Sequence, residues 1–209
     1  SNNADQAIQT FAPTGNANGD ATALEDVPDE NQSGATQVED DHKEENLRFV
    51  RICAQGNVKK VKTLLESKTI DFNATDPYGQ TGFYYACRHG HFKVVKVLVE
   101  KSESLGLNLN LAQLNGWTPF HSACYNKHDK IVDFLINSAP QVDINLKDPI
   151  GQSGLGLYFR KVCENGDLKA LKKLLKLEEK IDFNEPDKHG QTGLFWACWK
   201  GHFQVVKLL

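Results

Sequence analysis

Apolar residues recur in short groups through residues 46–209, and the spacing within each group fits one face of a helix. In the clearest stretch, Val94, Val95, Leu98 and Val99 stand at positions i, i+1, i+4 and i+5. This spacing forms an apolar stripe and predicts an amphipathic helix. A leucine recurs at one matched position of each group, at Leu64, Leu98, Leu135, Leu174 and Leu209. Such short helices cannot bury their apolar faces alone, so we expect them to pack on one another.

Five cysteines mark the period of this pattern. Cys53, Cys87, Cys124, Cys163 and Cys198 are separated by 34, 37, 39 and 35 residues. Their odd number argues against a complete disulfide framework, while the regular spacing indicates stacked supersecondary units. Three residues after the cysteine, four units have glycine (Gly56, Gly90, Gly166, Gly201) and the third has Lys127. Between units runs a shared Asn-x-x-Asp-x-x-Gly phrase, as in Asn73 to Gly79, with Gln113 replacing the acid once.

The matched positions predict the structure of one unit. Thr81 is suited to cap a short first helix, because its hydroxyl can accept a bond from a free backbone N–H. Ala86 and Cys87 are small enough for close helix packing, and Gly90 ends the helix because glycine adopts the left-handed conformation freely. The apolar stripe of the second helix follows. The Asn-x-x-Asp-x-x-Gly phrase is turn chemistry that returns the chain to the next unit.

These units resemble the ankyrin repeat. Asn115-Gly116-Trp117-Thr118-Pro119-Phe120-His121-Ser122-Ala123-Cys124 is similar to the family's asparagine/aspartate-glycine-x-threonine-proline-leucine-histidine-x-alanine core. Residues 79–96 and 190–209 are further copies. The resemblance implies an all-α ankyrin-repeat solenoid of helix-turn-helix units with β-hairpin-like loops. We expect four to five units over residues 46–209, in a monomeric array.

The sequence departs from the family pattern in two ways. Gly82, Gly154 and Gly193 stand where proline usually opens the first helix, and we expect glycine there to weaken the stack by about 1 kcal/mol or less per site. The fourth unit also has four extra residues between Ser153 and Cys163. Two arrangements fit: one continuous stack with an insertion at 153–157, or three repeats followed by a second array. The first is favoured.

Residues 1–45 differ sharply in composition from the rest. They hold eleven acidic residues and one lysine, a net charge of −10, whereas residues 46–209 hold sixteen acidic and twenty-three basic residues, a net of +7. A segment this polar cannot bury enough apolar surface to offset the entropy lost on ordering. Residues 1–45 are therefore predicted to be a disordered acidic tail. No signal peptide or membrane-spanning stretch is recognisable, and cytoplasm and/or nucleus is the expected location. The absence of methionine suggests a fragment of a longer protein.

Candidate chemistry is sparse. Three Cys/His pairs four residues apart (Cys87 and His91, Cys124 and His128, Cys198 and His202) invite a metal interpretation. A structural zinc site needs four converging ligands, and each unit offers two, so we expect packing cysteines and no metal. No serine elbow, phosphate loop or zinc-protease motif is present. We therefore expect no cofactor and no catalysis by these residues.

Lysines gather beside the apolar positions of the predicted second helices, at Lys59, Lys60, Lys62, Lys93, Lys96, Lys169, Lys172, Lys173 and Lys176. A solvated outer face is the favoured interpretation. The alternative is a basic surface that binds nucleic acid or anionic lipid. If nucleic-acid bases stacked on this surface, aromatic residues should be interleaved with the lysines, and they are not. A third hypothesis is that the acidic tail folds back weakly on the basic body.

The resemblance also indicates where a partner would bind. Ankyrin proteins use their hairpin tips and the exposed side of the first helix, on the concave face. Carried over by position, the candidate partner-binding residues are Tyr78, Gln80, Arg88, His89, Asn115, Trp117, Tyr125, Asn126, Ile150, His189, Trp199 and Lys200. Several are of the types that dominate interface energetics. We therefore predict a protein–protein interaction module or adaptor. The alternative is a substrate-targeting segment of a larger enzyme or channel.

Overall fold

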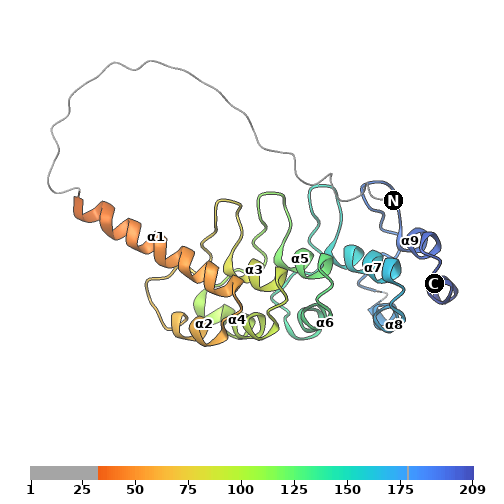
Figure 1. Cartoon of the computed structure of the whole chain (residues 1–209), viewed down its shortest axis with the longest axis horizontal. Helices are drawn as coiled ribbons and strands as arrows, with labels where there is room; N and C mark the ends of the chain where they lie inside the picture. Colours follow the sequence, from red (N-terminus) through yellow and green to blue (C-terminus); the bar gives the residue numbers. More distant parts are fainter. Residues whose placement is uncertain (1–32, 178) are drawn as a thin grey trace, which may run out of the picture.

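The structure, a computed structural model, describes residues 33–177 and 179–209. Within these ranges the chain forms five helix pairs in a row (Figure 1). The first helices of the pairs are α1 (Ser33–Ala54), α3 (Gly82–Arg88), α5 (Pro119–Tyr125), α7 (Gly154–Asn165) and α9 (Gly193–Trp199). The second helices are α2 (Val58–Leu64), α4 (Phe92–Leu105), α6 (Asp129–Ser138), α8 (Leu168–Leu174) and α10 (Phe203–Leu208), with a 3₁₀ turn, η1 (Leu175–Leu177), after α8. The predicted all-α class is confirmed.

The pairs stack in two layers. α1, α3, α5, α7 and α9 pack side by side, and the second helices form the layer beneath them (Figure 1). The core lies between the layers, where the matched leucines Leu98, Leu135 and Leu174 are buried. α7 packs on both α5 and α9, so the contacts between first helices continue on either side of residues 153–157.

Hairpin-like loops join the pairs and project from one edge of the first-helix layer (Figure 1). In three of them an aspartate organises the turn: Oδ1 of Asp76, Asp148 and Asp187 each accepts two backbone N–H groups, at 2.8–3.1 Å. The glycine that closes each turn has a positive φ, for example 75° at Gly79. The aspartate and glycine of the Asn-x-x-Asp-x-x-Gly phrase are therefore explained by turn geometry.

The structure places helix in part of the predicted tail. Residues 1–32 lie outside the described residues, but residues 33–45 form the first turns of α1. The helix continues into the core through Phe49, which is fully buried. Two side chains hold the extension against the next loop, since Asn46 Oδ1 accepts from the Asp71 amide at 2.8 Å and Glu45 Oε2 from the Thr69 hydroxyl at 2.9 Å. The boundary that composition sets at residue 45 thus falls inside a helix stabilised by tertiary contacts.

The three helix-opening glycines allow aromatic rings to approach. A Cβ on Gly82 would lie 2.9 Å from the Phe49 ring, and one on Gly154 would lie 2.5 Å from the Phe120 ring. A Cβ on Gly193 would overlap Phe159. Each phenylalanine belongs to the preceding unit and is buried. Glycine at these positions therefore has a packing role that its low helix propensity does not reveal.

Histidines link neighbouring units at the other end of the first helices. Nε2 of His91, His128 and His202 donates to the carbonyls of Ala54, Arg88 and Glu164 respectively, at 2.8–2.9 Å. Each of these imidazoles lies against the glycine that ends the preceding first helix, where a Cβ would come within 2.5–2.7 Å of the ring. The Cys/His pairs thus consist of a histidine that bonds to backbone and a cysteine that, in Cys87 and Cys124, is fully buried.

The junction between the third and fourth units replaces this contact. Lys127 occupies the glycine position with φ 54°, and Asp167 occupies the histidine position. Lys127 Nζ lies 2.6 Å from Asp167 Oδ2, so an ion pair stands where the other junctions have a histidine packed on glycine. The hydrogen bond from Lys127 lowers the pKa of the Asp167 carboxyl. Asp167 also caps α8 by accepting from the Ala170 amide at 3.0 Å.

The four extra residues lengthen α7 and produce a step in the stack. Gly154 begins α7 against Phe120, the second residue of α5, whereas Gly193 begins α9 against Phe159, the sixth residue of α7. The fifth unit therefore starts about one helical turn further along its neighbour than the fourth does. The loops reflect the step: a Cβ on Gly116 would overlap Pro149 of the next loop, but one on Gly151 would meet nothing within 4 Å.

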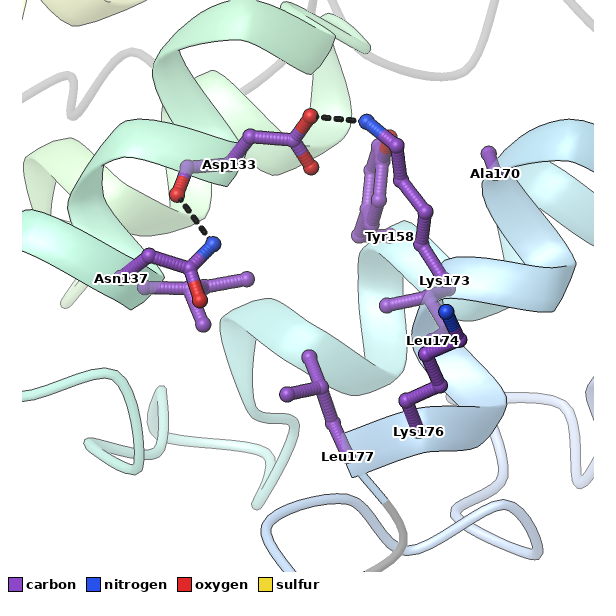
Figure 2. Close-up of a pocket in the computed structure, with 9 residues that line it drawn as sticks. Asp133, Asn137, Tyr158, Ala170, Lys173, Leu174, Lys176 and Leu177 are labelled. Carbon is purple, nitrogen blue, oxygen red and sulfur yellow. Dashed lines mark hydrogen bonds and ion pairs between the residues drawn. The ribbon is translucent and has the colours of Figure 1, made fainter.

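A cavity of about 260 Å³ separates α6 from α8 at the same place (Figure 2). The buried Tyr158, from the extra turn of α7, borders it and donates its hydroxyl to Asp129 Oδ1 at 2.8 Å. Lys173 of α8 bonds to Asp133 of α6 across the cavity (Figure 2). The Lys173–Asp133 pair thus connects α6 with α8, and Tyr158 connects α7 with α6. By contrast, α4 packs directly on both α2 and α6.

Candidate protein-interaction groove

A hollow of about 670 Å³ runs along the first helices beside the hairpin loops. We call it the concave groove. Residues from α3, α5 and α7 and from the loops around Gly116, Gly151 and Gly190 line it. The repeated units therefore build one surface from side chains that lie more than a hundred residues apart in sequence.

Aromatic residues form the middle of the concave groove. The rings of Trp117 and Tyr125 have centroids 5.1 Å apart, and Lys161 Nζ lies 5.3 Å above the Tyr125 ring. Trp117 is half-buried and donates its indole N–H to Asp148 Oδ2 at 3.2 Å. Tyr125 is 40% exposed and Ile150 is 61% exposed. The groove thus offers a rigid aromatic surface flanked by an accessible aliphatic side chain.

A chain of amide and hydroxyl groups fixes one end of the groove. Gln80 is buried, and its Nε2 donates to Gln113 Oε1 at 2.6 Å. Gln113 in turn donates to the Tyr84 hydroxyl at 2.6 Å. Arg88 is exposed and donates to Gln80 Oε1 at 3.3 Å. Gln113 stands where the other loops have an aspartate. Its amide connects the second and third units through Gln80 and Tyr84.

A buried ion pair fixes the other end. Arg160 is 5% exposed and Glu185 is 6% exposed. The guanidinium donates to the Glu185 carbonyl at 2.9 Å and to Gln152 Oε1 at 3.0 Å, and lies 3.5 Å from Glu185 Oε1. The Glu185 carboxylate also accepts from the amide and hydroxyl of Ser153, at 2.9 and 2.8 Å. Burial lowers the pKa of Arg160, which Glu185 opposes, and the dense hydrogen bonding compensates the loss of water.

The groove gathers eight of the twelve predicted partner-binding residues: Gln80, Arg88, Asn115, Trp117, Tyr125, Asn126, Ile150 and His189. The other four lie outside its lining. Tyr78 is 67% exposed on a hairpin loop, and His89 stacks on Tyr85 with centroids 5.8 Å apart. Trp199 and Lys200 are exposed at the end of α9, and no further first helix covers that side within the described residues. Contact between these twelve residues and a partner stays a prediction.

The twelve predicted residues include none from α7, although the position carried over to the fourth unit is Glu164. Leu157, Arg160, Lys161 and Glu164 line the groove, and so does Trp196 of α9. The available signal was the four-residue insertion, because it lengthens α7 and displaces the next hairpin loop from its neighbour. Only the packed structure shows that residues of the lengthened α7 line the concave groove.

The lysine-rich face lies on the second helices, away from the groove. All nine lysines of this face are exposed. Lys96 pairs with Glu100 and Lys173 with Asp133. None of the described helices has the length and apolarity needed to cross a membrane.

Comparison with known protein families agrees with this geometry. A family model described as ankyrin repeats (3 copies) matches residues 49–148, and one described as ankyrin repeats (many copies) matches residues 159–209. The chain belongs to the ankyrin-repeat family. The two matches are separated at residues 149–158, which include the loop around Gly151 and the extra turn of α7. The family's repeats are protein-interaction modules in general, and no enzyme family is indicated.

Two curated relatives share part of this sequence. The acyl-CoA-binding domain-containing protein 6 of Rattus norvegicus is 34% identical over 58 residues, which are 28% of this chain and 21% of the relative. The Danio rerio protein of the same name is 30% identical over 60 residues, 29% of this chain and 20% of the relative. The matches thus span about a fifth of these relatives.

Proposed function

We propose that this chain is a protein-interaction module that holds a partner protein in the concave groove. The observation that carries the proposal is the gathering of Trp117, Tyr125 and Ile150 around one hollow on a rigid stack. Aromatic side chains supported by such a framework lose little conformational entropy on binding, and they are enriched among residues that dominate interface energies. The role follows the general use of ankyrin repeats.

The arrangement favours recognition without rearrangement of the stack. Trp117 is held by its neighbour Tyr125 and by Asp148, and the Asp148 carboxylate is itself fixed by two backbone amides. A groove preformed in this way presents the same shape before and after binding. The mechanism is therefore presentation of a fixed surface, and the partner supplies any chemistry.

Removal of groove side chains tests the proposal. We expect a double variant, Tyr125→Ala with Ile150→Ala, to lose proteins that the intact chain captures, as measured by quantitative mass spectrometry. Both residues are substantially exposed, so the helical signal in circular dichroism should persist. Phe203→Ala is the matched control, since Phe203 is 69% exposed on the second-helix layer. Equal capture by all three proteins would reject the groove as the binding site.

A second candidate is a targeting role within a larger protein. The curated relatives extend far beyond the matched segment, and their name specifies an acyl-CoA-binding domain. In such a protein the ankyrin stack would select the partner while another domain binds the ligand. The coding sequence around this segment decides between the two candidates.

A basic surface for nucleic acid or anionic lipid is a third candidate. The exposed lysines of the second helices support it, but Trp117, Tyr125 and Trp196 line the concave groove and are not interleaved with these lysines. Binding to that surface would weaken steeply with salt and would survive the Tyr125→Ala and Ile150→Ala substitutions.

A further inference from the structure

The carboxylates that line the concave groove are already engaged within the protein. Asp148 accepts two backbone amides and the Trp117 indole, and Asp187 accepts two backbone amides and the Trp196 indole at 3.4 Å. Glu164 pairs with Lys161 at 3.0 Å. These three acids stabilise loops and side chains. Each already has a hydrogen-bond or ion-pair partner within the protein.

Two of the four basic residues that line the groove, Arg88 and Lys188, are less committed, whereas Arg160 and Lys161 pair with Glu185 and Glu164. Lys188 is exposed on the loop around Gly190, and Arg88 is exposed with a single bond of 3.3 Å to Gln80. Their positions flank the aromatic middle, Arg88 on α3 and Lys188 beyond α7. Lys161, half-buried above Tyr125, is paired with Glu164 and is not counted with them. The charged side chains that the groove leaves most accessible to a ligand are therefore basic, although its lining also contains acidic residues.

Positive charge and apolar surface alternate along the groove. Between Arg88 and Lys188 lie Trp117, Tyr125 and Ile150, which present rings and an aliphatic side chain. Complementarity requires opposite charge at the two flanks and an apolar group in the middle. Arginine favours carboxylates in particular, because its planar guanidinium can bind both oxygens.

We propose that the concave groove binds an extended segment of a partner protein in which acidic residues flank an aromatic or aliphatic anchor. This inference rests on the proposed function and specifies the partner's chemistry. The anchor lies on Trp117 and Tyr125 beside Ile150, while its acidic neighbours pair with Arg88 and Lys188. Affinity comes mainly from the anchor, and the charges determine which sequences are accepted.

Selection from a random 12-residue peptide library displayed on phage tests the inference on the full chain. Selected peptides are expected to combine an excess of Asp and Glu with at least one aromatic or large aliphatic residue. Arg88→Glu with Lys188→Glu should weaken their binding about tenfold or more, and added salt should weaken binding to the parent. Lys59→Glu with Lys60→Glu is the matched control on α2, for which the expected change is about twofold or less.

The results separate this inference from the proposed function. Peptides without an acidic excess, or an equal loss in the two charge-reversed proteins, overturn the acidic-segment inference. If the Tyr125→Ala, Ile150→Ala variant binds the selected peptides as tightly as the parent does, the groove is rejected as the binding site. Failure to select any peptide rejects it as well. A single-stranded oligonucleotide that displaces the peptides as well as acidic peptides do would indicate a polyanion site and also overturn the inference.

The acidic residues of this same chain are the remaining competitor. Residues 1–32 hold six acidic residues and no basic ones. A variant of the 209-residue chain with those six residues changed to Asn or Gln provides the comparison. If peptides bind this variant and fail to bind the parent, the chain's own acidic segment occupies the groove and the proposal of a separate partner fails.

Discussion

At the scale of single residues, Lys127 and Asp167 show how a junction can exchange one kind of contact for another. A lone lysine at the glycine position would meet the histidine of the next unit, as the close approach of His128 to Gly90 shows. Here the histidine position holds aspartate, and the clash becomes an ion pair. The two departures from the repeat pattern are therefore one coupled feature.

His121 makes the stability of the stack depend on pH. The side chain is 1% exposed, its Nε2 donates to the Gln152 carbonyl at 3.0 Å, and its Nδ1 lies 2.8 Å from the Thr118 hydroxyl. Burial lowers the pKa of His121, opposed in part by the Gln152 carbonyl. Because the unfolded chain takes up the proton more readily, the neutral histidine stabilises the fold fully above pH ~6.5, and this stability declines as pH falls below that value.

We therefore expect the free energy of unfolding to fall more between pH 7.5 and 5.5 for the parent than for His121→Leu. Urea denaturation at the two pH values measures both. The substitution removes hydrogen bonds and lowers stability throughout, so only the pH-dependent difference is informative. Parallel changes in the two proteins would show that His121 does not titrate in this way.

Gly193 should resist substitution by alanine. Alanine normally favours a helix over glycine by up to about 1 kcal/mol, but its Cβ would overlap the Phe159 ring, and overpacking typically costs about 1–3 kcal/mol. We expect a net loss of stability by chemical denaturation. In a Phe159→Leu background the ring is absent, and the same substitution should become neutral or stabilising. An equal loss in both backgrounds would contradict the packing explanation.

At the scale of elements, α7 sets the geometry of the groove. Its extra turn supplies Leu157 to the groove lining and Tyr158 to the cavity beside α6, and it brings Gly156 against Glu185, where a Cβ would overlap the carboxylate. The insertion is thus accommodated by particular contacts on both faces of the helix.

Deletion of residues 155–158 should restore a regular unit. The joined sequence Ser153-Gly154-Phe159 would match Thr81-Gly82-Phe83, so the chain should still fold. The loops around Gly151 and Gly190 would then align as those around Gly79 and Gly116 do, where the Leu114 amide donates to the Tyr78 carbonyl at 3.1 Å. We expect a new bond from Lys188 to Ile150.

Amide hydrogen exchange measured by NMR checks this prediction. The Lys188 amide should exchange slowly in the deletion variant and rapidly in the parent, whereas the Leu114 amide serves as an internal reference. Rapid exchange at Lys188 in a well-folded variant would mean that the extra turn does not cause the step.

At the scale of the whole molecule, each unit covers core residues of the unit before it. Cys53, Cys87, Cys124 and Cys163 are all buried, whereas Cys198 of the last described unit is exposed. Burial raises the pKa of the Cys53 and Cys163 thiols to about 12 and raises those of Cys87 and Cys124 as well. Since the thiolate is the reactive form, four of the five thiols are protected by the stack.

Iodoacetamide should therefore label Cys198 first in the native protein. The four buried cysteines should react only as the stack opens, and their rates measured by mass spectrometry should rise together in urea. A second cysteine that reacts as fast as Cys198 under native conditions would show that its unit opens independently. The experiment reports on the cooperativity of the array as well as on burial.

The sequence by itself determined the repeat, the helices and the turns, because each depends on local chemistry that recurs at matched positions. Thr81 caps a helix and Asp76 organises a loop through neighbours a few residues away. Residues 33–45 could not be assigned this way, since their helix depends partly on contacts of Glu45 and Asn46 with a loop some 24–25 residues later.

The tertiary structure alone decided what the irregular positions do. Gly193 is explained by a ring in the preceding unit, Lys127 by a carboxylate 40 residues away, and Arg160 by Glu185. The candidate groove was predicted in part, because hairpin tips follow from the repeat, yet the lining from α7 depends on how one extra turn is packed. Contacts between units carry no local signature, so their partners become visible only when the units are stacked.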